Sequence, residues 1–261
     1  MRIAGSSLMC SRRGLSEACE RVAALGFDAI DIGAMPGWAH VEPLDVLECP
    51  DHTAQRVADA CDRAGLTPVA LNANTDVEAL PEEIERVEAL IHLAEHLGAD
   101  VLTLQGGSTD VMLEDDLARF RSLTRAVETD VAVTVETHWG THLENPDIAR
   151  RYGEIDGLGL TLDPSHYLIG DYRPAEYRQL LPFVEHVHLR QAGSGWKQVQ
   201  QPPETGRLDV PGTIAALAKA GYDGVLSIEY IDSITDTDPA TVESQAEDMR
   251  ERVVEAIATL E

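Results

Sequence analysis

Apolar and polar positions follow two different periods along this chain. In residues 131–136, valines occupy every second position, and alanine, threonine and glutamate lie between them. That period of two is typical of a β-strand. In residues 81–98, apolar residues recur at spacings of three and four, as on one face of a helix, and glycine follows at the end. Similar stretches of both kinds alternate along the sequence, so strands and helices are predicted to follow one another.

Eight strands are predicted by this pattern, with helices between them. Their ranges are 3–8, 29–33, 68–72, 101–105, 131–136, 158–163, 184–189 and 225–229. Strands that alternate with helices form a parallel sheet. Eight such units in 261 residues match a (β/α)₈ TIM barrel, an α/β fold that we expect residues 1–261 to form as a single domain. An open doubly wound sheet is the alternative, but no G-x-G-x-x-G follows the first strand.

The two sides of the predicted strands differ in the size of their residues. In 131–136 and 158–163, valine or leucine alternates with alanine, glycine and threonine. Small residues fit the crowded interior of a barrel, whereas bulky residues pack outward against the helices. This alternation therefore identifies which side of each strand faces the interior.

The inward side ends in a polar residue on each strand from the third to the eighth. These residues are Asn72, Gln105, Glu136, Asp163, His188 and Glu229. In a parallel barrel the carboxyl ends of the strands share one rim, where enzymes of this fold place their active sites. Neighbouring strands lie roughly 4.8 Å apart, so these side chains can converge. Three carboxylates so close together repel one another unless a cation lies between them.

A divalent metal is therefore predicted, with Glu136, Asp163, His188 and Glu229 as its ligands. Three oxygen donors and one imidazole favour one hard or borderline ion, with Mn²⁺ ahead of Mg²⁺, Co²⁺ and Zn²⁺. Any one of these residues alone is more simply explained as an ion pair or a solvated strand end. Four of them in the same register favour the metal site.

The segments around these residues resemble a known family. They read VTVETH, LTLDPSHY, HVHLRQ, GRLD and GYDGVLSIEY. They are similar to the sugar phosphate isomerase/epimerase family, the xylose-isomerase-like TIM barrels that include ketose 3-epimerases and family 2 AP endonucleases. The resemblance covers essentially the whole chain and is strongest over residues 97–230. It implies the same four metal ligands, a substrate-contacting or second-metal role for His166, and a position near substrate for Arg190.

The sequence departs from the family pattern at two places, and both limit the activities that the resemblance implies. Many members read H-x-K-D after the metal histidine, whereas this chain continues with Arg190 and Gln191 and so lacks the acidic residue. AP endonucleases carry additional histidines after the fourth and seventh strands, where this chain reads LTLQGG and QVQQPPETG. A trinuclear zinc site is therefore predicted to be incomplete.

The resemblance and the predicted rim together indicate an enzyme, a metal-dependent isomerase or epimerase. Its substrate is expected to be a sugar or polyol ketone, phosphorylated or not. One glutamate, Glu136 or Glu229, would remove the proton α to the carbonyl, and the other would return a proton to the enediolate. His166 and Arg190 would orient substrate oxygens. Three further residues are expected to contact substrate: His138, Trp139 and Gln105.

Three alternatives stay open at this point. A lyase on the same scaffold would dehydrate a keto-polyol through the same enediolate. A zinc phosphodiesterase resembling AP endonucleases is disfavoured by the missing histidines. A sugar-binding module without catalysis would bind but not turn over. Outside the metal ligands, His186 is expected to be hydrogen-bonded within the barrel, and Trp38 and Trp196 lie in loops that could cover a substrate.

Charge is the strongest feature of the composition. There are 46 acidic and 20 basic residues, which gives a net charge of −26. Such a field repels nucleic acid and suits a protein that must stay hydrated in a salt-rich cytoplasm, so a halophilic source is predicted.

No apolar run is long enough to cross a membrane, and the N-terminus lacks the pattern of a signal peptide. We therefore expect a cytoplasmic protein without a membrane partner; a homo-oligomer is compatible with the sequence.

Overall fold

Within residues 1–77, 79–234 and 237–260, which the computed structural model describes, eight parallel strands close into a barrel. Strand β1 pairs with both β9 and β2, and this double pairing closes the sheet. The barrel strands are β1 (Arg2–Ser6), β2 (Ala29–Met35), β4 (Thr67–Ala73), β5 (Val101–Leu104), β6 (Ala132–Glu136), β7 (Gly159–Leu162), β8 (Val184–Leu189) and β9 (Val225–Ile228). The predicted (β/α)₈ TIM barrel is confirmed.

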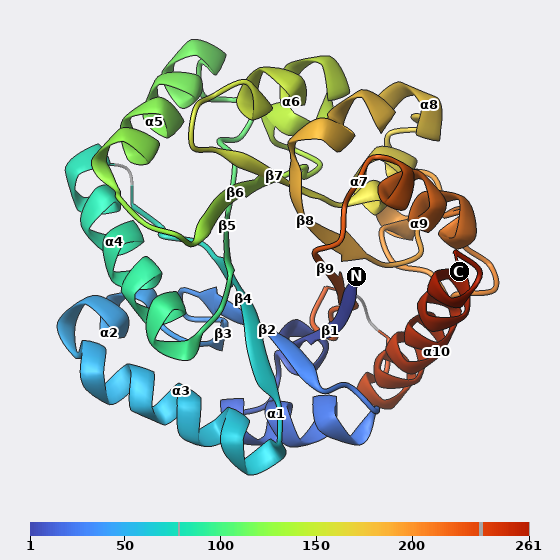
Figure 1. The fold of residues 1–261 in the computed structure, drawn as a ribbon, viewed down its shortest axis with the longest axis horizontal. Helices are drawn as coiled ribbons and strands as arrows, with labels where there is room; N and C mark the ends of the chain where they lie inside the picture. The colour runs from blue at the N-terminus through green and yellow to red at the C-terminus, as the bar shows by residue number, and fades with distance from the viewer. Residues whose placement is uncertain (78, 235–236, 261) are drawn as a thin grey trace.

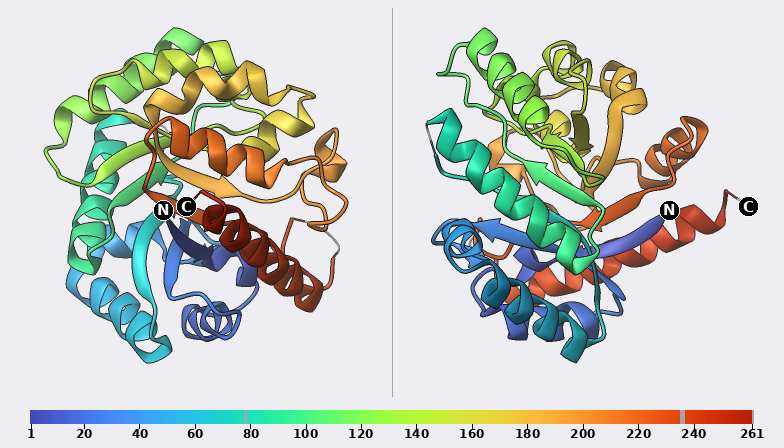
Figure 2. Two further views of the ribbon diagram at one scale, coloured as in Figure 1. Left: turned by 45° about the vertical axis from the view of Figure 1, so that its right-hand side comes forward. Right: turned by 60° about the vertical axis from the view of Figure 1, so that its left-hand side comes forward.

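Helices form a ring around the barrel (Figure 1), and the two further views show them covering its outer surface (Figure 2). The α-helices are α1 (Leu15–Ala24), α2 (Pro43–Glu48), α3 (Pro50–Ala64), α4 (Leu80–Leu97), α5 (Leu113–Ala126), α6 (Pro146–Gly153), α7 (Pro164–Ile169), α8 (Pro174–Tyr177), α9 (Val210–Lys219) and α10 (Pro239–Ala258). The 3₁₀ helices are η1 (Ser7–Cys10), η2 (His142–Glu144), η3 (Arg178–Phe183) and η4 (Trp196–Gln198). No helix in the described part of the chain is long and apolar enough to cross a membrane.

Helix α4 shows how local sequence signals set the boundaries. It begins at Leu80 with a proline in its first turn, where a backbone N–H has no intrahelical partner to lose. It ends at Leu97, and Gly98 follows with φ of 68°, a left-handed conformation that glycine adopts without strain. The helix predicted for residues 81–98 is therefore present.

The first strand is shorter than the alternation predicts. It ends at Ser6, because the chain turns into η1, and the Ser6 hydroxyl accepts a hydrogen bond from the backbone N–H of Leu8. A two-residue strand, β3 (Ala39–His40), was not predicted; it pairs antiparallel with the end of β2. Both differences lie on the rim where the strands end, and they shape the loops there.

The predicted division between inward and outward residues is confirmed. Bulky residues of β5, β6, β7 and β9 belong to the main hydrophobic core between the barrel and the helices. Inside the barrel, the hydroxyls of Thr103, Thr134 and Thr161 hydrogen-bond to one another at 2.6–3.1 Å. These threonines lie beneath Glu136, so the interior is packed and polar just below the rim.

Candidate metal centre

The rim residues converge as the strand register predicts. Two overlapping groups share Glu136: one contains His188 and Glu229, and the other contains Asp163 and His166. Within each group the candidate ligand atoms all lie within 4.8 Å of one another, and every residue is buried. The four predicted ligands are thus gathered around Glu136, with His166 as a fifth neighbour.

Asp163 is held by the start of the next helix. It follows β7 directly and is the N-cap of α7, where its Oδ1 accepts a hydrogen bond from the backbone N–H of Ser165 at 2.8 Å. Its other oxygen, Oδ2, has no hydrogen-bond partner of good geometry. One oxygen is therefore structural, while the other points into the site, where Arg190 Nη2 lies 3.1 Å from it and an added cation would take the place of that contact.

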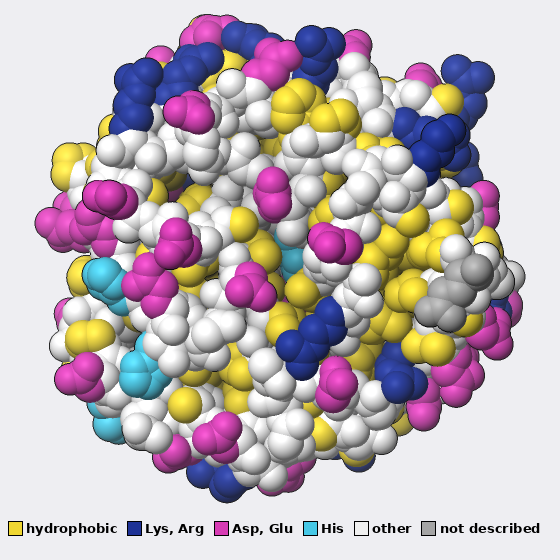
Figure 3. Space-filling view, in the orientation of Figure 1, with side chains coloured by type: hydrophobic (Ala, Val, Ile, Leu, Met, Phe, Trp, Pro, Cys, Tyr) yellow, Lys and Arg dark blue, Asp and Glu magenta, His cyan; other side chains and the backbone are white. Residues whose placement is uncertain are grey.

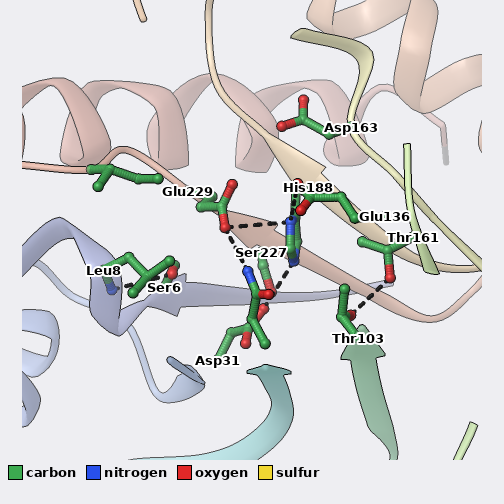
Figure 4. A network of polar contacts seen from close by, with 12 residues as sticks. Ser6, Leu8, Asp31, Thr103, Glu136, Thr161, Asp163, His188, Ser227 and Glu229 are labelled. Carbon is green, nitrogen blue, oxygen red and sulfur yellow. Dashed lines mark hydrogen bonds and ion pairs between the residues drawn. The ribbon is translucent and has the colours of Figure 1, made fainter. Parts of the chain in front are cut away.

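The two glutamates are each oriented by an amide from an earlier strand. Gln105 donates from Nε2 to Oε2 of Glu136 at 2.9 Å, and Asn72 donates from Nδ2 to Oε1 of Glu229 at 2.9 Å. His188 Nδ1 lies between the carboxylates, 3.3 Å from Glu136 Oε1 and 3.4 Å from Glu229 Oε1 (Figure 4). The rim amides thus fix both carboxylates around the same imidazole nitrogen.

Arg190 supplies the positive charge of the site. Its guanidinium is buried; Nη2 lies 3.1 Å from Asp163 Oδ2, and Nη1 lies 3.5 Å from Glu229 Oε2. Nε donates to the hydroxyl of Ser165 at 2.9 Å. Because Nη1 makes no hydrogen bond, one donor of this group remains available on the wall of the cavity.

The two glutamates differ in their electrostatic environment. Burial raises the pKa of Glu229, and the nearby Glu136 raises it further. Burial also acts to raise the pKa of Glu136, but the hydrogen bond and charge of His188 outweigh it and hold that pKa well below its usual value. The carboxyls that flank His188 therefore differ in proton affinity although they look alike in sequence.

The donor set fits a divalent cation. Ligand atoms of Glu136 lie within 4.8 Å of those of His188 and Glu229 in one group and of Asp163 in the other, and Asp163 Oδ2 pairs with the Arg190 guanidinium without a hydrogen bond. Such a mixture of hard oxygen donors and one nitrogen suits ions from Mg²⁺ and Mn²⁺ to Zn²⁺. The residues therefore could hold a metal, and they do not by themselves select one ion.

A cavity of about 240 Å³ opens from these residues toward the rim loops. Its polar wall includes both glutamates, Gln105, His138 and Arg190. An apolar wall completes most of the lining and consists of Leu8, Met35, Pro36, Trp38, Trp196, Val199, Ile231 and Ile234. Reasoning from strand register missed most of this wall, because loop residues carry no periodic signal.

The remaining predicted site residues lie in different places. His138 lines the cavity and packs against the buried His166, with ring centroids 3.9 Å apart and the rings tilted by 44°. Trp139 packs against the main core instead and is not among the cavity-lining residues of the described chain. Trp38 and Trp196, noted above as loop residues, do line the cavity, and His186 is hydrogen-bonded inside the barrel as expected.

A family model shows to which family the chain belongs. The family model described as "Xylose isomerase-like TIM barrel" matches residues 19–253, which is most of the chain. The chain belongs to this family. No curated protein matches it.

Solved structures of xylose isomerase-like barrels share the fold at low sequence identity. A D-tagatose 3-epimerase-like protein has a TM-score of 0.74 at 20% identity, covering 98% of this chain and 100% of its own. The probable 3-DHS dehydratase AsbF of Bacillus anthracis has a TM-score of 0.74 at 15% identity, with coverages of 96% and 99%. The IOLI protein, solved with a bound zinc atom, has a TM-score of 0.74 at 16% identity and covers 99% of each chain. At these identities the likeness establishes the fold.

Proposed function

We propose that this xylose isomerase-like barrel is a metal-dependent isomerase or epimerase acting on a sugar or polyol ketone. The observation that carries the proposal is the placement of Glu136 and Glu229. They come from β6 and β9, and both carboxylates lie within 3.4 Å of His188 Nδ1. Two carboxyls that face one small volume from different strands can exchange a proton with both faces of a substrate carbon held between them.

Different residues of the site would have different roles in such a reaction. One glutamate removes the proton from the carbon α to the carbonyl, and the other delivers a proton to the resulting enediolate. The free donor of Arg190 and the imidazole of His166 orient substrate oxygens, because both groups lie beside Asp163. His138 and Gln105 contact substrate from the same polar wall. Each proton transfer of this kind typically contributes about 10²- to 10⁴-fold to the rate.

A metal ion would be held by Glu136, Asp163, His188 and Glu229, and we propose Mn²⁺ on the grounds of the mixed donor set. Bound there, a divalent ion supplies Lewis-acid polarisation of the substrate carbonyl.

Dehydration of a keto-polyol is the second candidate, because it begins with the same proton abstraction. The two reactions part at the next step: an epimerase returns a proton to carbon, whereas a lyase expels a hydroxyl as water. Arg190 Nη1, which makes no hydrogen bond within the described residues, is placed to donate one to a leaving hydroxyl. Analysis of the products by NMR distinguishes dehydration from epimerisation.

The test is a proton NMR screen of ketoses and keto-polyols in D₂O with Mn²⁺-loaded protein, the ion being removed before spectra are recorded. The proposal predicts deuterium at the carbon α to the carbonyl and an isomeric product with the same number of oxygens. Loss of water would establish the lyase, and binding without any deuterium incorporation would contradict catalysis. Glu136→Gln and Glu229→Gln should each abolish exchange, whereas Glu185→Gln, at an exposed position of β8, should leave it unchanged.

A further inference from the structure

A fourth carboxylate lies below the rim, inside the barrel. Asp31, on β2, is completely buried, and its side chain reaches across the interior toward β8. β2 and β8 are not hydrogen-bonded neighbours, because β1 and β9 lie between them. A charged side chain without contact with water is costly unless its partners compensate for it, so the partners of Asp31 explain why it is there.

One partner is His188, whose two ring nitrogens face different carboxylates (Figure 4). Nδ1 faces the rim, between Glu136 and Glu229. Nε2 faces the barrel interior and lies 3.2 Å from Asp31 Oδ2. The imidazole thus bridges the site at the rim and the carboxylate beneath it.

We propose that Asp31 is a positioning residue that sets the tautomer and the orientation of His188. If the proton of the neutral ring sits on Nε2 and is donated to Asp31, Nδ1 carries its lone pair toward Glu136 and Glu229. A metal can bind only the nitrogen that carries the lone pair, and a carboxylate behind a ligating histidine also makes that nitrogen a stronger donor. This inference rests on the metal site proposed above.

The second partner, His186, holds Asp31 in place. Its Nε2 lies 3.1 Å from the same Oδ2 and 3.1 Å from the hydroxyl of Ser227. The rings of His186 and His188 meet edge to face, with centroids 5.0 Å apart and an angle of 88°. Oδ2 therefore faces two imidazoles that follow one another on the inward side of β8, and His186 acts through Asp31 rather than on the rim.

The same residues could instead bind a second metal ion. Asp31, His186 and His188 offer ligand atoms within 4.8 Å of one another, as metal sites do. We favour protons over a second ion, because Asp31 Oδ2 accepts a hydrogen bond from His186 Nε2 at 3.1 Å and lies 3.2 Å from His188 Nε2, within hydrogen-bond distance although this second contact has only the geometry of an ion pair. The number of ions bound per chain distinguishes the two arrangements.

The test compares Asp31→Asn with wild type by two measurements that need no substrate. The dissociation constant for Mn²⁺ is measured by competition with a chelator, and the tautomer of His188 is read from ¹⁵N chemical shifts of the metal-free protein at a pH high enough to keep the ring neutral. We expect Asp31→Asn to weaken Mn²⁺ binding by about 10- to 100-fold, the range typical for removing such a partner. The variant should also lose the single Nε2–H form of His188. Thr103→Val is the matched control, since it removes a polar group from the barrel interior that bonds only to other threonines, and it should leave both measurements unchanged.

Three results would overturn the proposal. One is Mn²⁺ affinity in Asp31→Asn within twofold of wild type; another is two ions bound per wild-type chain. The third is ligation of the ion through Nε2 of His188 in the wild-type protein. This result needs no variant, so it can be obtained even if Asp31→Asn fails to fold. None of these measurements depends on turnover, so a failure of the proposed isomerase activity with intact metal binding would leave the inference standing.

Discussion

Arg190 Nη2 lies 2.7 Å from His166 Nε2, so a permanently charged guanidinium faces a nitrogen of a buried imidazole. Burial, together with the charges of His138 and Arg190, holds the pKa of His166 well below its usual value. His166 is therefore neutral and accepts a hydrogen bond from Arg190. Arg190 therefore belongs to the site's charge balance, in addition to the substrate-orienting role that we propose for it.

The first prediction concerns Arg190→Met in metal-free protein. The substitution leaves the buried Asp163 carboxylate without its cation, and breaking a buried ion pair from one side typically costs about 3–5 kcal/mol. The free energy of unfolding measured by urea in EDTA should fall accordingly, and added Mn²⁺ should restore part of it. Arg207→Met breaks an exposed pair with Asp171 and should leave the free energy of unfolding nearly unchanged, because solvent screens such pairs. Equal stability of Arg190→Met and wild type in EDTA would refute this charge balance.

The second prediction is a pH dependence of the metal-free protein. Burial raises the pKa of Glu229 from 4.5 to about 8 in the folded state, so between these values the native chain holds a proton that the unfolded chain has released. The melting temperature in EDTA should therefore fall as the pH rises from 5 to 8. His188, whose pKa is also raised in spite of its burial, acts in the same direction above pH 6.5. Glu229→Gln should flatten the slope, and an unchanged slope would contradict the assignment.

The barrel and its rim were predictable because they obey a period. Small residues at alternate positions, such as Ala132 and Thr134, mark the interior of β6 and place Glu136 on the rim, and the same rule applies to Asp163 and Glu229. Strand ends follow from sequence only approximately: β1 stops at Ser6, where a side-chain hydrogen bond starts a 3₁₀ turn within an otherwise strand-like run.

What was not predicted depends on contacts between residues that are far apart in the chain. Asp31 sits in an ordinary apolar strand, and its partner His186 is 155 positions away. Only the closed barrel brings them together. The apolar wall of the cavity has the same origin, because Leu8, Met35 and Ile231 come from three different strand ends and form one small hydrophobic cluster. No local pattern in the sequence marks such residues as a set.

The third prediction uses the tryptophans as reporters of the cavity. Trp38 and Trp196 line it and are 40% and 49% exposed, whereas Trp139 lies against the main core. A ligand in the cavity should change the emission of the first two. Titration of an active ketose should therefore alter the fluorescence of the Trp139→Phe variant as much as that of wild type. If the change were lost in Trp139→Phe but kept in the Trp38→Phe, Trp196→Phe double variant, the ligand would lie elsewhere.

The fourth prediction concerns salt. The net charge is −26, and acidic side chains are scattered over the face shown in Figure 3 rather than gathered in one patch. Their mutual repulsion is screened by salt, so we propose a protein adapted to a salt-rich cytoplasm. The melting temperature should rise steadily from millimolar to molar KCl. A melting temperature that is independent of KCl would count against halophilic adaptation.

The metal site itself is tested most directly by anomalous diffraction from crystals grown with Mn²⁺. The account predicts one strong peak per chain, within bonding distance of carboxylate oxygens from Glu136, Asp163 and Glu229 and of Nδ1 of His188. A fully occupied Mn²⁺ that lies outside these four residues, or a saturated crystal in which the Arg190 guanidinium remains between Asp163 and Glu229 with no ion beside them, would contradict it.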